Sequence, residues 1–196
     1  PFRTWTPKQI ENATVEQALS HPNWRMGRKI SIDSATMDNK CIEIVEAHHL
    51  FAVPPQRIEV VVHPQSIVHS AVAFQDGSVM AQMGVSDMRI PILYALSGGR
   101  RLDSGAAPLS LFDMPQLTFE RCDTEKFPAV AMAYAAIEAG GNACCVLNAA
   151  NEAAVAAFFA GQIAFGQIVK WIRLAMDRLF DPAPLLDYAS VCACDE

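Results

Sequence analysis

Apolar side chains recur every three or four positions between residues 34 and 50, which is the spacing of one face of an α-helix. This pattern predicts a single amphipathic helix over residues 34–50, with Pro54-Pro55 as the break that follows it. Its buried stripe consists of Met37, Cys41, Ile44, Val45 and His48. Its opposite side consists of Asn39, Lys40, Glu43, Glu46 and Ala47.

Strand patterns come next along the chain. A β-branched run at residues 58–62 predicts a buried strand. Residues 67–74 and 78–85 flank an Asp76-Gly77 pair, and both positions of such a pair accept the positive φ angles of a tight hairpin turn. We therefore predict an antiparallel hairpin, followed by a helix at residues 87–96.

The N-terminal region combines a short helix with a loop. Thr14 and Gln17 have the spacing of a capping box, which predicts a helix at residues 14–20. Residues 21–33 mix Trp24 and glycine with several cations, a composition typical of a mobile covering loop. The alternative is a plain surface loop.

The C-terminal part of the chain is predicted to be a linker followed by helices. Residues 98–123 are rich in Gly, Pro, Ser and Asp without any period, which predicts a linker. Helical signals follow at 128–139, 145–160 and 165–180, enough for a small bundle. We therefore expect an α+β protein in which residues 1–97 place helices on a small mixed sheet, residues 98–123 form the linker and residues 124–196 form an all-α domain.

Composition excludes several classes of protein. A formal net charge of −6 argues against a protein that wraps nucleic acid or lies on an anionic membrane. No apolar run is long enough to span a bilayer, and no export signal is present. The six cysteines lack the spacing of a disulfide framework, so we expect free thiols in a reducing cytoplasm. The first residue is Pro, and we expect the sequence to begin inside a longer protein.

Candidate chemistry gathers in the first half of the chain. There is no dinucleotide-binding glycine pattern and no nucleophile elbow. Ser34, Asn39, Lys40 and Glu43 could form a cluster in which Ser34, at the helix N-terminus, joins Asn39 and Lys40 in holding a phosphate while Glu43 binds a divalent cation. The alternative is an ordinary solvated helix face, which is the commoner situation.

Single aromatic and histidine side chains have two interpretations each. Trp24 either packs under its loop or closes over a ligand, and His21 either caps that loop or contacts the ligand. His63 and His69 border a strand, where a structural role is the commoner one and substrate contact the alternative.

Three strings, in order and at the expected intervals, carry a resemblance. They are HPNWRMGRKISIDSATMDNKCIEIVEA (21–47), EVVVHPQSIVHSAVAFQDGSVMAQMGVSDMRIPILYAL (59–96) and VLNAANEAAVAAF (146–158). Together they resemble 1-deoxy-D-xylulose 5-phosphate reductoisomerase, over essentially the whole chain, as the second half of that enzyme. The resemblance implies an enzyme of non-mevalonate isoprenoid biosynthesis, cytoplasmic or plastid and usually a homodimer, which converts its phosphorylated sugar substrate to 2-C-methyl-D-erythritol 4-phosphate with NADPH and Mg²⁺ or Mn²⁺.

The resemblance also implies roles for individual residues. Glu43 matches the helix-borne metal ligand, and with His21 it is a candidate catalytic residue. Ser34, Asn39 and Lys40 match the phosphate ligands. The loop that covers substrate matches His21, Trp24 and Met26, and contact with the cofactor is expected at Gly27 and Met26. His69 lies in a motif near the site. Closure of this loop would exclude water from a reactive aldehyde, and the local cations Arg25, Arg28, Lys29 and Lys40 would recruit the anionic substrate.

Some features depart from the family pattern. The N-terminal NADPH-binding domain and an Asp-x-Glu metal motif are not in this sequence, so we expect the chain alone to be inactive. Cys41 stands where the family usually has Gly, and its packing could shift the helix. Asp38 would add a carboxylate beside the phosphate site. The sequence also stops short of the family's longer C-terminal helix.

Two alternatives from other classes remain. One is a non-catalytic dimerisation or scaffold fragment. The other is a zinc module built from His48, His49 and the C-terminal cysteines, which is poor on spacing.

Overall fold

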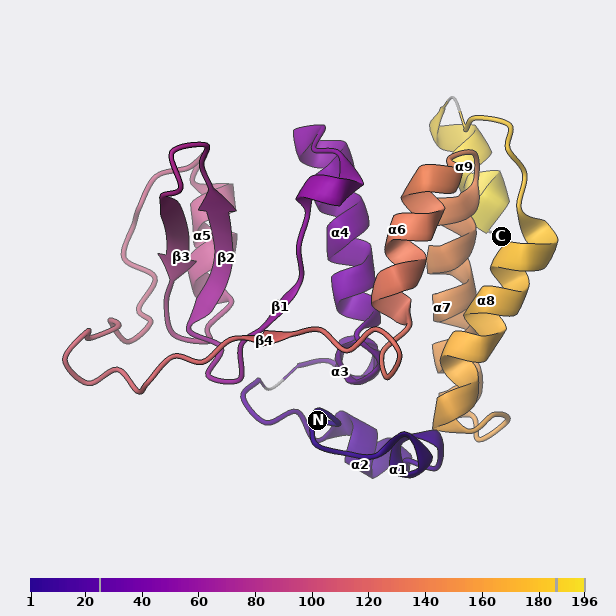
Figure 1. Ribbon diagram of the computed structural model, residues 1–196, viewed down its shortest axis with the longest axis horizontal. Coiled ribbons are helices and arrows are strands. Elements are labelled where there is room, and N and C mark those ends of the chain that lie inside the picture. The colour runs from indigo at the N-terminus through magenta and orange to yellow at the C-terminus, as the bar shows by residue number, and fades with distance from the viewer. Residues whose placement is uncertain (25, 186, 196) are drawn as a thin grey trace. The chain divides into compact units, whose positions relative to one another are not determined.

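The computed structural model describes residues 1–24, 26–185 and 187–195 (Figure 1). Its helices are α1 (Pro7–Glu11), α2 (Val15–Leu19), α3 (Arg28–Thr36), α4 (Asp38–Phe51), α5 (Arg89–Leu96), α6 (Ala129–Ala139), α7 (Ala143–Phe159), α8 (Ile168–Leu179) and α9 (Tyr188–Asp195), with 3₁₀ turns η1 (Pro55–Arg57) and η2 (Phe165–Gln167). Its strands are β1 (Val61–Val62), β2 (Val68–Ala73), β3 (Val79–Met83) and β4 (Glu120–Arg121).

The chain forms two compact units. Unit 1 consists of Pro1–Val60 together with Cys122–Glu196, and unit 2 consists of Val61–Arg121. The predicted division at residues 97 and 123 differs from these units, because helix α4 of the first half packs against α6 of the second half. As a statement about domains of the whole protein, that division stays a prediction.

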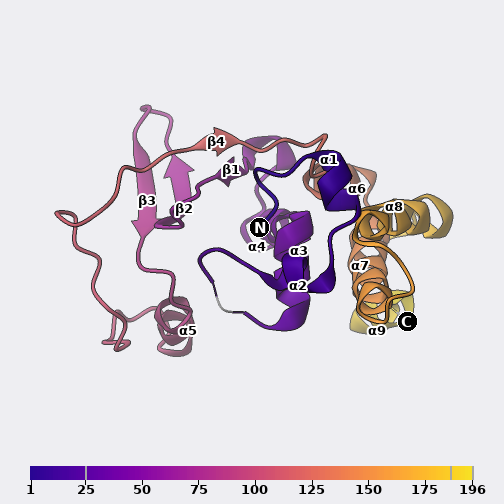
Figure 2. The same cartoon turned by 90° about the horizontal axis from the view of Figure 1, so that it is seen from below.

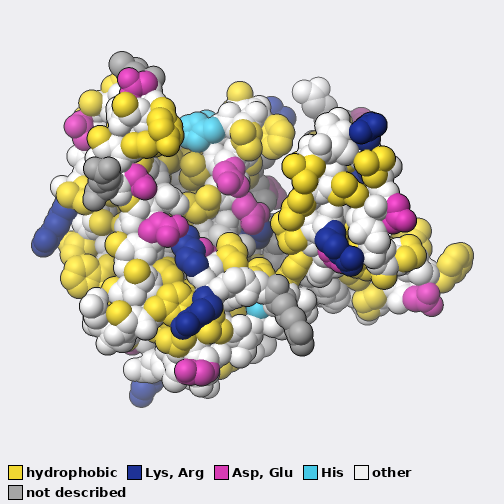
Figure 3. Space-filling view, turned by 180° about the vertical axis from the view of Figure 1, so that it is seen from behind, with side chains coloured by type: hydrophobic (Ala, Val, Ile, Leu, Met, Phe, Trp, Pro, Cys, Tyr) yellow, Lys and Arg dark blue, Asp and Glu magenta, His cyan; other side chains and the backbone are white. Residues whose placement is uncertain are grey.

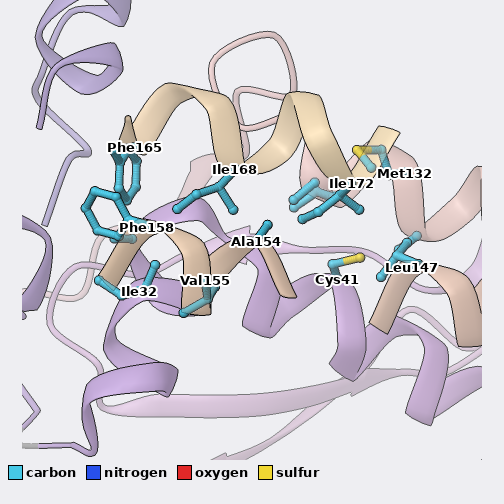
Figure 4. Packing of buried hydrophobic residues seen from close by; sticks show 14 of the residues in the cluster. Ile32, Cys41, Met132, Leu147, Ala154, Val155, Phe158, Phe165, Ile168 and Ile172 are labelled. Carbon is cyan, nitrogen blue, oxygen red and sulfur yellow. The ribbon is translucent and has the colours of Figure 1, made fainter. Parts of the chain in front are cut away.

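Unit 1 is a helical body around one apolar core. Helices α4, α6, α7 and α8 run side by side (Figure 1), and α2 and α3 lie at one end of them (Figure 2). Side chains from α3, α4, α7 and α8 meet in one cluster (Figure 4). Phe165 is a corner of this core, because its ring meets those of Phe2 and Phe158 edge-on at centroid distances of 5.0 and 5.5 Å. Burying these aromatic and aliphatic side chains is the main force that holds the unit together.

The predicted helix 34–50 is wrong in one respect, because it is two helices. Met37 adopts a left-handed conformation (φ 67°, ψ 15°) that ends α3 and begins α4. The Thr36 hydroxyl stabilises the break by accepting a hydrogen bond from the Asp38 amide at 3.3 Å. The predicted loop 21–33 is correspondingly too long, since α3 begins at Arg28 after Gly27. Periodicity missed the break because the buried stripe continues across it, with Ile32, Cys41 and Ile44 all in the core.

Unit 2 contains the predicted hairpin. Strands β2 and β3 pair antiparallel, with a bulge between Val68 and Ser70, and Gly77 has the positive φ (85°) that the turn requires. The predicted buried strand at 58–62 is wrong, because only Val61–Val62 is a strand and Val61 is 54% exposed. It pairs antiparallel with β4, inside the segment that we expected to be a linker.

The α+β class is confirmed. In the described part of the chain the strands form two antiparallel pairs, β1–β4 and β2–β3, rather than one mixed sheet. The predicted C-terminal helices correspond to α6, α7 and α8, and Gly140 with φ 66° ends α6. Among the described residues no helix has both the length and the apolar character needed to cross a bilayer.

Candidate functional site

Helix α4 brings three of the predicted side chains to its first two turns. The Lys40 ammonium forms an ion pair with the Glu43 carboxylate, three positions further along the helix. The Lys40 side chain is 38% exposed and that of Glu43 52% exposed, while Asn39 is half-buried. The predicted amide, cation and carboxylate are therefore on one accessible stretch of helix, and the exposed ion pair leaves both charged groups open to ligands at little energetic cost.

Ser34 reaches the site from a different helix. It was expected at the N-terminus of the helix that carries Asn39, but it lies half-buried in the last turn of α3. That expectation is wrong because Met37, in a left-handed backbone conformation, ends α3 before α4 begins. Ser34 can therefore contribute its hydroxyl from the end of α3, whereas the helix N-terminus in this stretch is that of α4, which begins at Asp38.

The loop before α3 is organised by His21. Its Nδ1 atom accepts hydrogen bonds from the backbone amides of Trp24 at 2.9 Å and Asn23 at 3.2 Å. Burial lowers the pKa of His21, which fits a neutral ring whose Nδ1 is an acceptor. The loop-capping role weighed for His21 is therefore present, and its Nε2 atom is the one left to face a ligand. Trp24 and Met26 are half-buried.

Two of the four cations expected to recruit substrate are engaged inside unit 1. The Arg28 guanidinium lies 4.7 Å from the centroid of the Phe159 ring. The Lys29 ammonium pairs with Asp33 at 2.9 Å and with Glu152 at 2.8 Å. Arg25 lies outside the described residues. Lys40 is thus the cation that the described part of the chain presents beside the site.

Asp38 does not lie where the sequence suggested. It was expected beside the phosphate site, but it is 1% exposed, and neither of its carboxylate oxygens has a hydrogen-bond partner within the described ranges. Burial, reinforced by the nearby Asp33 charge, raises the pKa of Asp38 to about 7. The neighbouring Cys41 is fully buried, as its place in the stripe predicted, and burial raises the pKa of its thiol.

The two strand-border histidines make structural contacts in unit 2. His63 Nδ1 lies 2.8 Å from the Thr118 carbonyl oxygen, and its ring stacks on that of Phe119 with centroids 4.7 Å apart. His69 Nε2 lies 3.2 Å from the Gly84 carbonyl oxygen. The commoner of their two interpretations, a structural role, therefore accounts for both contacts.

Comparison with known proteins identifies the family. A family model described as the DXP reductoisomerase C-terminal domain matches residues 83–196, and a second, described as the 1-deoxy-D-xylulose 5-phosphate reductoisomerase C-terminal domain, matches residues 1–51. The chain belongs to the 1-deoxy-D-xylulose 5-phosphate reductoisomerase family. The resemblance seen in the sequence is thereby confirmed.

Individual reductoisomerases support the assignment. The chain is 53% identical to that of Aromatoleum aromaticum, over 92% of this chain and 45% of the relative, and 53% identical to that of Bordetella avium, over 96% and 47%. A solved reductoisomerase from Zymomonas mobilis in complex with NADPH superposes with a TM-score of 0.90 at 43% identity, over 100% of this chain and 50% of that one. A complex of DOX-P reductoisomerase with NADPH, fosmidomycin and magnesium gives 0.91 at 42%, over 99% and 50%.

The chain spans about half the length of the curated relatives it matches. The described residues hold no cluster of three or more His, Cys, Asp or Glu side chains that could bind an ion. Glu43 fits a divalent cation as one oxygen ligand, since it is accessible and carries a hard donor, but such cations take about six ligands. Other oxygen ligands, including water and substrate, would complete the coordination of a bound cation.

Two pockets of the described residues lie away from these side chains. The larger one described has a volume of about 630 Å³ and is lined by parts of α1, α8 and the segment before α6. The second lies between α7 and α9. Neither of these two pockets is lined by Ser34, Asn39, Lys40 or Glu43.

Proposed function

We propose that this chain is part of an NADPH- and divalent-metal-dependent reductoisomerase that converts 1-deoxy-D-xylulose 5-phosphate to 2-C-methyl-D-erythritol 4-phosphate in non-mevalonate isoprenoid biosynthesis in the cytoplasm. The observation that carries the proposal is the pairing of Lys40 with Glu43 on an accessible turn of α4, in a chain of this family. The NADPH and metal of the solved relatives support the same cofactors for the complete protein.

Different residues bind the substrate phosphate and the divalent cation. Ser34, Asn39 and Lys40 hold the substrate phosphate with a hydroxyl, an amide and an ammonium group, and this anchor orients the sugar from a distance. Glu43 holds the divalent cation, which when bound would polarise substrate oxygens as a Lewis acid. Because Lys40 and Glu43 pair with each other in the free chain, binding replaces one exposed ion pair with two charged contacts.

The loop of residues 21–27 covers the substrate. His21, Trp24 and Met26 close over it and exclude water, with His21 presenting Nε2 because Nδ1 is held by backbone amides. Met26 and Gly27 contact the cofactor. Gly27 suits close approach, since nothing lies within 4 Å of where its Cβ would be.

Self-association is supported by the hairpin of unit 2. Val72, Val79 and Met80 are 58%, 63% and 68% exposed, and Figure 3 shows apolar atoms on the surface of this unit. Apolar side chains on a two-stranded hairpin favour pairing with another surface. A second copy of the chain is the partner we propose. The observation also fits a scaffold fragment, which would pair through the same hairpin without catalysing a reaction.

The proposal is tested by Glu43→Gln in the complete protein. The variant keeps the shape of the side chain but loses the charge that holds a cation, so the apparent affinity for Mn²⁺ should fall by about 100-fold or more, with turnover. Glu46→Gln is the matched control, since Glu46 is exposed on the same helix and should leave both unchanged.

The same pair of variants separates enzyme from scaffold. If the complete protein showed no metal-dependent turnover and Glu43→Gln abolished dimer formation, the scaffold alternative would replace the proposal. The isolated chain, given substrate, Mn²⁺ and NADPH, should oxidise no cofactor, because it lacks the partner residues of the site.

A further inference from the structure

A network of four side chains joins α3 to α7 inside unit 1. The Asp33 carboxylate is 3% exposed; its Oδ1 accepts a hydrogen bond from Asn151 Nδ2 at 3.0 Å, and its Oδ2 pairs with Lys29 Nζ at 2.9 Å. Lys29 also pairs with Glu152 at 2.8 Å. We call these residues, Lys29, Asp33, Asn151 and Glu152, the α3–α7 network. They fall in two of the strings that the sequence resemblance rests on, but none has a role in the site described above.

Asn151 is the buried link of the network. It is 0% exposed, whereas the Glu152 side chain is 57% exposed and its ion pair is accordingly weak. A buried carboxylate depends on its hydrogen-bond donors, because water cannot replace a lost one. The hydrogen bond between Asp33 and the Asn151 amide therefore fixes the position of α3 along α7.

The position of Asp33 connects this link to the site. Ser34 is the next residue, the chain turns at Met37, and Asn39 and Lys40 follow in the first turn of α4. A shift of the last turn of α3 therefore moves the Ser34 hydroxyl directly and changes where α4 begins. Asp33 and Asn151 are both buried, and their sequence neighbours Ile32 and Ala150 belong to the apolar core or pack against it. Because protein interiors are closely packed, a change in this hydrogen bond should shift α3.

We propose that Asn151 is a positioning residue for the phosphate site: its amide, acting through Asp33, sets where the α3–α4 segment holds Ser34, Asn39 and Lys40 against a phosphate ester. The inference rests on the proposed function, because it assigns those three residues to the phosphate. Asn151 itself touches no substrate. The site thus depends on a helix of the C-terminal half of the chain.

The test compares Asn151→Ala with Asn142→Ala in the complete protein. Asn142 is a matched control because it is a buried asparagine of the same region, at the N-terminal end of α7, where it donates to Leu179 O at 2.9 Å and accepts from Asp181 N at 2.8 Å. Both variants should lower the melting temperature. Only Asn151→Ala should raise KM for the phosphorylated substrate, by roughly 10-fold, since small displacements of a binding group are costly. An unchanged KM in Asn151→Ala would mean a structural role alone and overturn the inference.

A double variant that restores the hydrogen bond between positions 33 and 151 tests the inference further. Asn151→Asp places a second carboxylate against Asp33 and should raise KM further. Adding Asp33→Asn restores an amide–carboxylate hydrogen bond in the reverse direction, so KM should return to within a few-fold of the wild type. A double variant with a KM as high as that of Asn151→Asp alone would count against positioning through this bond.

A third measurement separates this inference from the function it rests on. Lys40→Met should raise KM whether or not Asn151 matters; if Lys40→Met has no effect, the proposed phosphate site fails. If Lys40→Met raises KM and Asn151→Ala does not, only the inference fails. Hydrogen exchange of the amides of residues 33–40 gives a readout without activity. The exchange should be faster in Asn151→Ala but not in Asn142→Ala. Equal protection in the two variants would show that Asn151 does not hold the α3–α4 segment in place.

Discussion

Asp38 is the residue whose environment is least expected from its chemistry. An isolated aspartate side chain prefers water, yet this one is buried in unit 1, close to the Asp33 carboxylate and to Cys41. The Lys29 ammonium acts in the opposite direction, and the net result is a pKa of about 7 against an ordinary value of 3.8. A carboxyl group that stays protonated avoids most of the cost of burying a charge without partners.

The raised pKa predicts a stability that falls as pH rises. The folded chain keeps the Asp38 proton up to about pH 7, whereas the unfolded chain releases it near 3.8. Between these values the unfolded state binds fewer protons, so the free energy of unfolding should decrease with pH by about 1.4 kcal/mol per pH unit and level off above pH 7. Urea unfolding of wild type and Asp38→Asn between pH 4.5 and 8 measures this, and the variant should gain in relative stability as pH rises.

Asp76→Asn is the control for the pH series. Hydrogen bonds from Ser78 lower the pKa of Asp76, so it titrates below this range and its variant should differ from wild type by a constant amount. An Asp38→Asn difference that was equally constant would show that Asp38 does not change protonation between pH 4.5 and 8.

At the level of elements, two non-glycine residues in the left-handed region delimit α4. Met37 (φ 67°) precedes it, and Ala52 (φ 51°) ends it. Side chains with a Cβ atom are strained in this conformation by roughly 1 kcal/mol, and helices usually place glycine there. Neither position carries the glycine signal, which is why the sequence placed one break at Pro54-Pro55 and missed the other.

Ala52→Gly should therefore stabilise the protein. Ala52 is exposed, so the change removes only the strained methyl group, and the relief should raise the free energy of unfolding by about 0.5–1 kcal/mol. Ala47→Gly is the control: Ala47 lies inside α4, where glycine costs about 1 kcal/mol relative to alanine. Thermal unfolding of the two variants should give shifts of opposite sign, and a destabilised Ala52→Gly would contradict the strain argument.

Local sequence patterns predicted the helices and the hairpin better than the long-range contacts between them. The hairpin, the Thr14 capping box and the α6–α8 helices have strong short-range signals, and each is present. The Lys40–Glu43 pair followed from helical spacing alone. The Asp33–Asn151 hydrogen bond joins residues 118 positions apart, and no local signal distinguishes such a pair from solvated polar residues. The burial of Asp38 is likewise a tertiary effect, because packing of α4 decides it.

The whole molecule is divided by packing rather than by sequence order. Unit 1 takes its helices from both ends of the chain, and the Tyr134 hydroxyl in α6 donates a hydrogen bond to the Ile58 carbonyl oxygen at 2.9 Å. Composition placed a boundary at residues 98–123, where Gly and Pro are dense. Composition cannot show that the residues before and after that segment share a core, since long-range contacts leave no local pattern.

The unit division predicts that residues 61–121 can be removed. Val61 pairs with Arg121 and Val62 with Glu120, so the chain enters and leaves unit 2 as two adjacent antiparallel strands. The flanking Val60 and Cys122 both pack against the core of unit 1 and are close enough to be joined by a two-residue Asn-Gly turn. The resulting chain should keep its helical circular dichroism and unfold cooperatively on heating.

Residues 124–196 alone provide the contrasting case. This segment keeps α6, α7 and α8 but loses α3 and α4, so the apolar face of α6 and the Asn151 amide are exposed to water. The free energy of unfolding of a small domain is only a few kcal/mol. Losing this buried area should therefore leave the segment loosely packed, with a broad thermal transition. If it unfolded as sharply as the joined unit 1 chain, the linear division at residue 123 would describe the folding unit better than the discontinuous one.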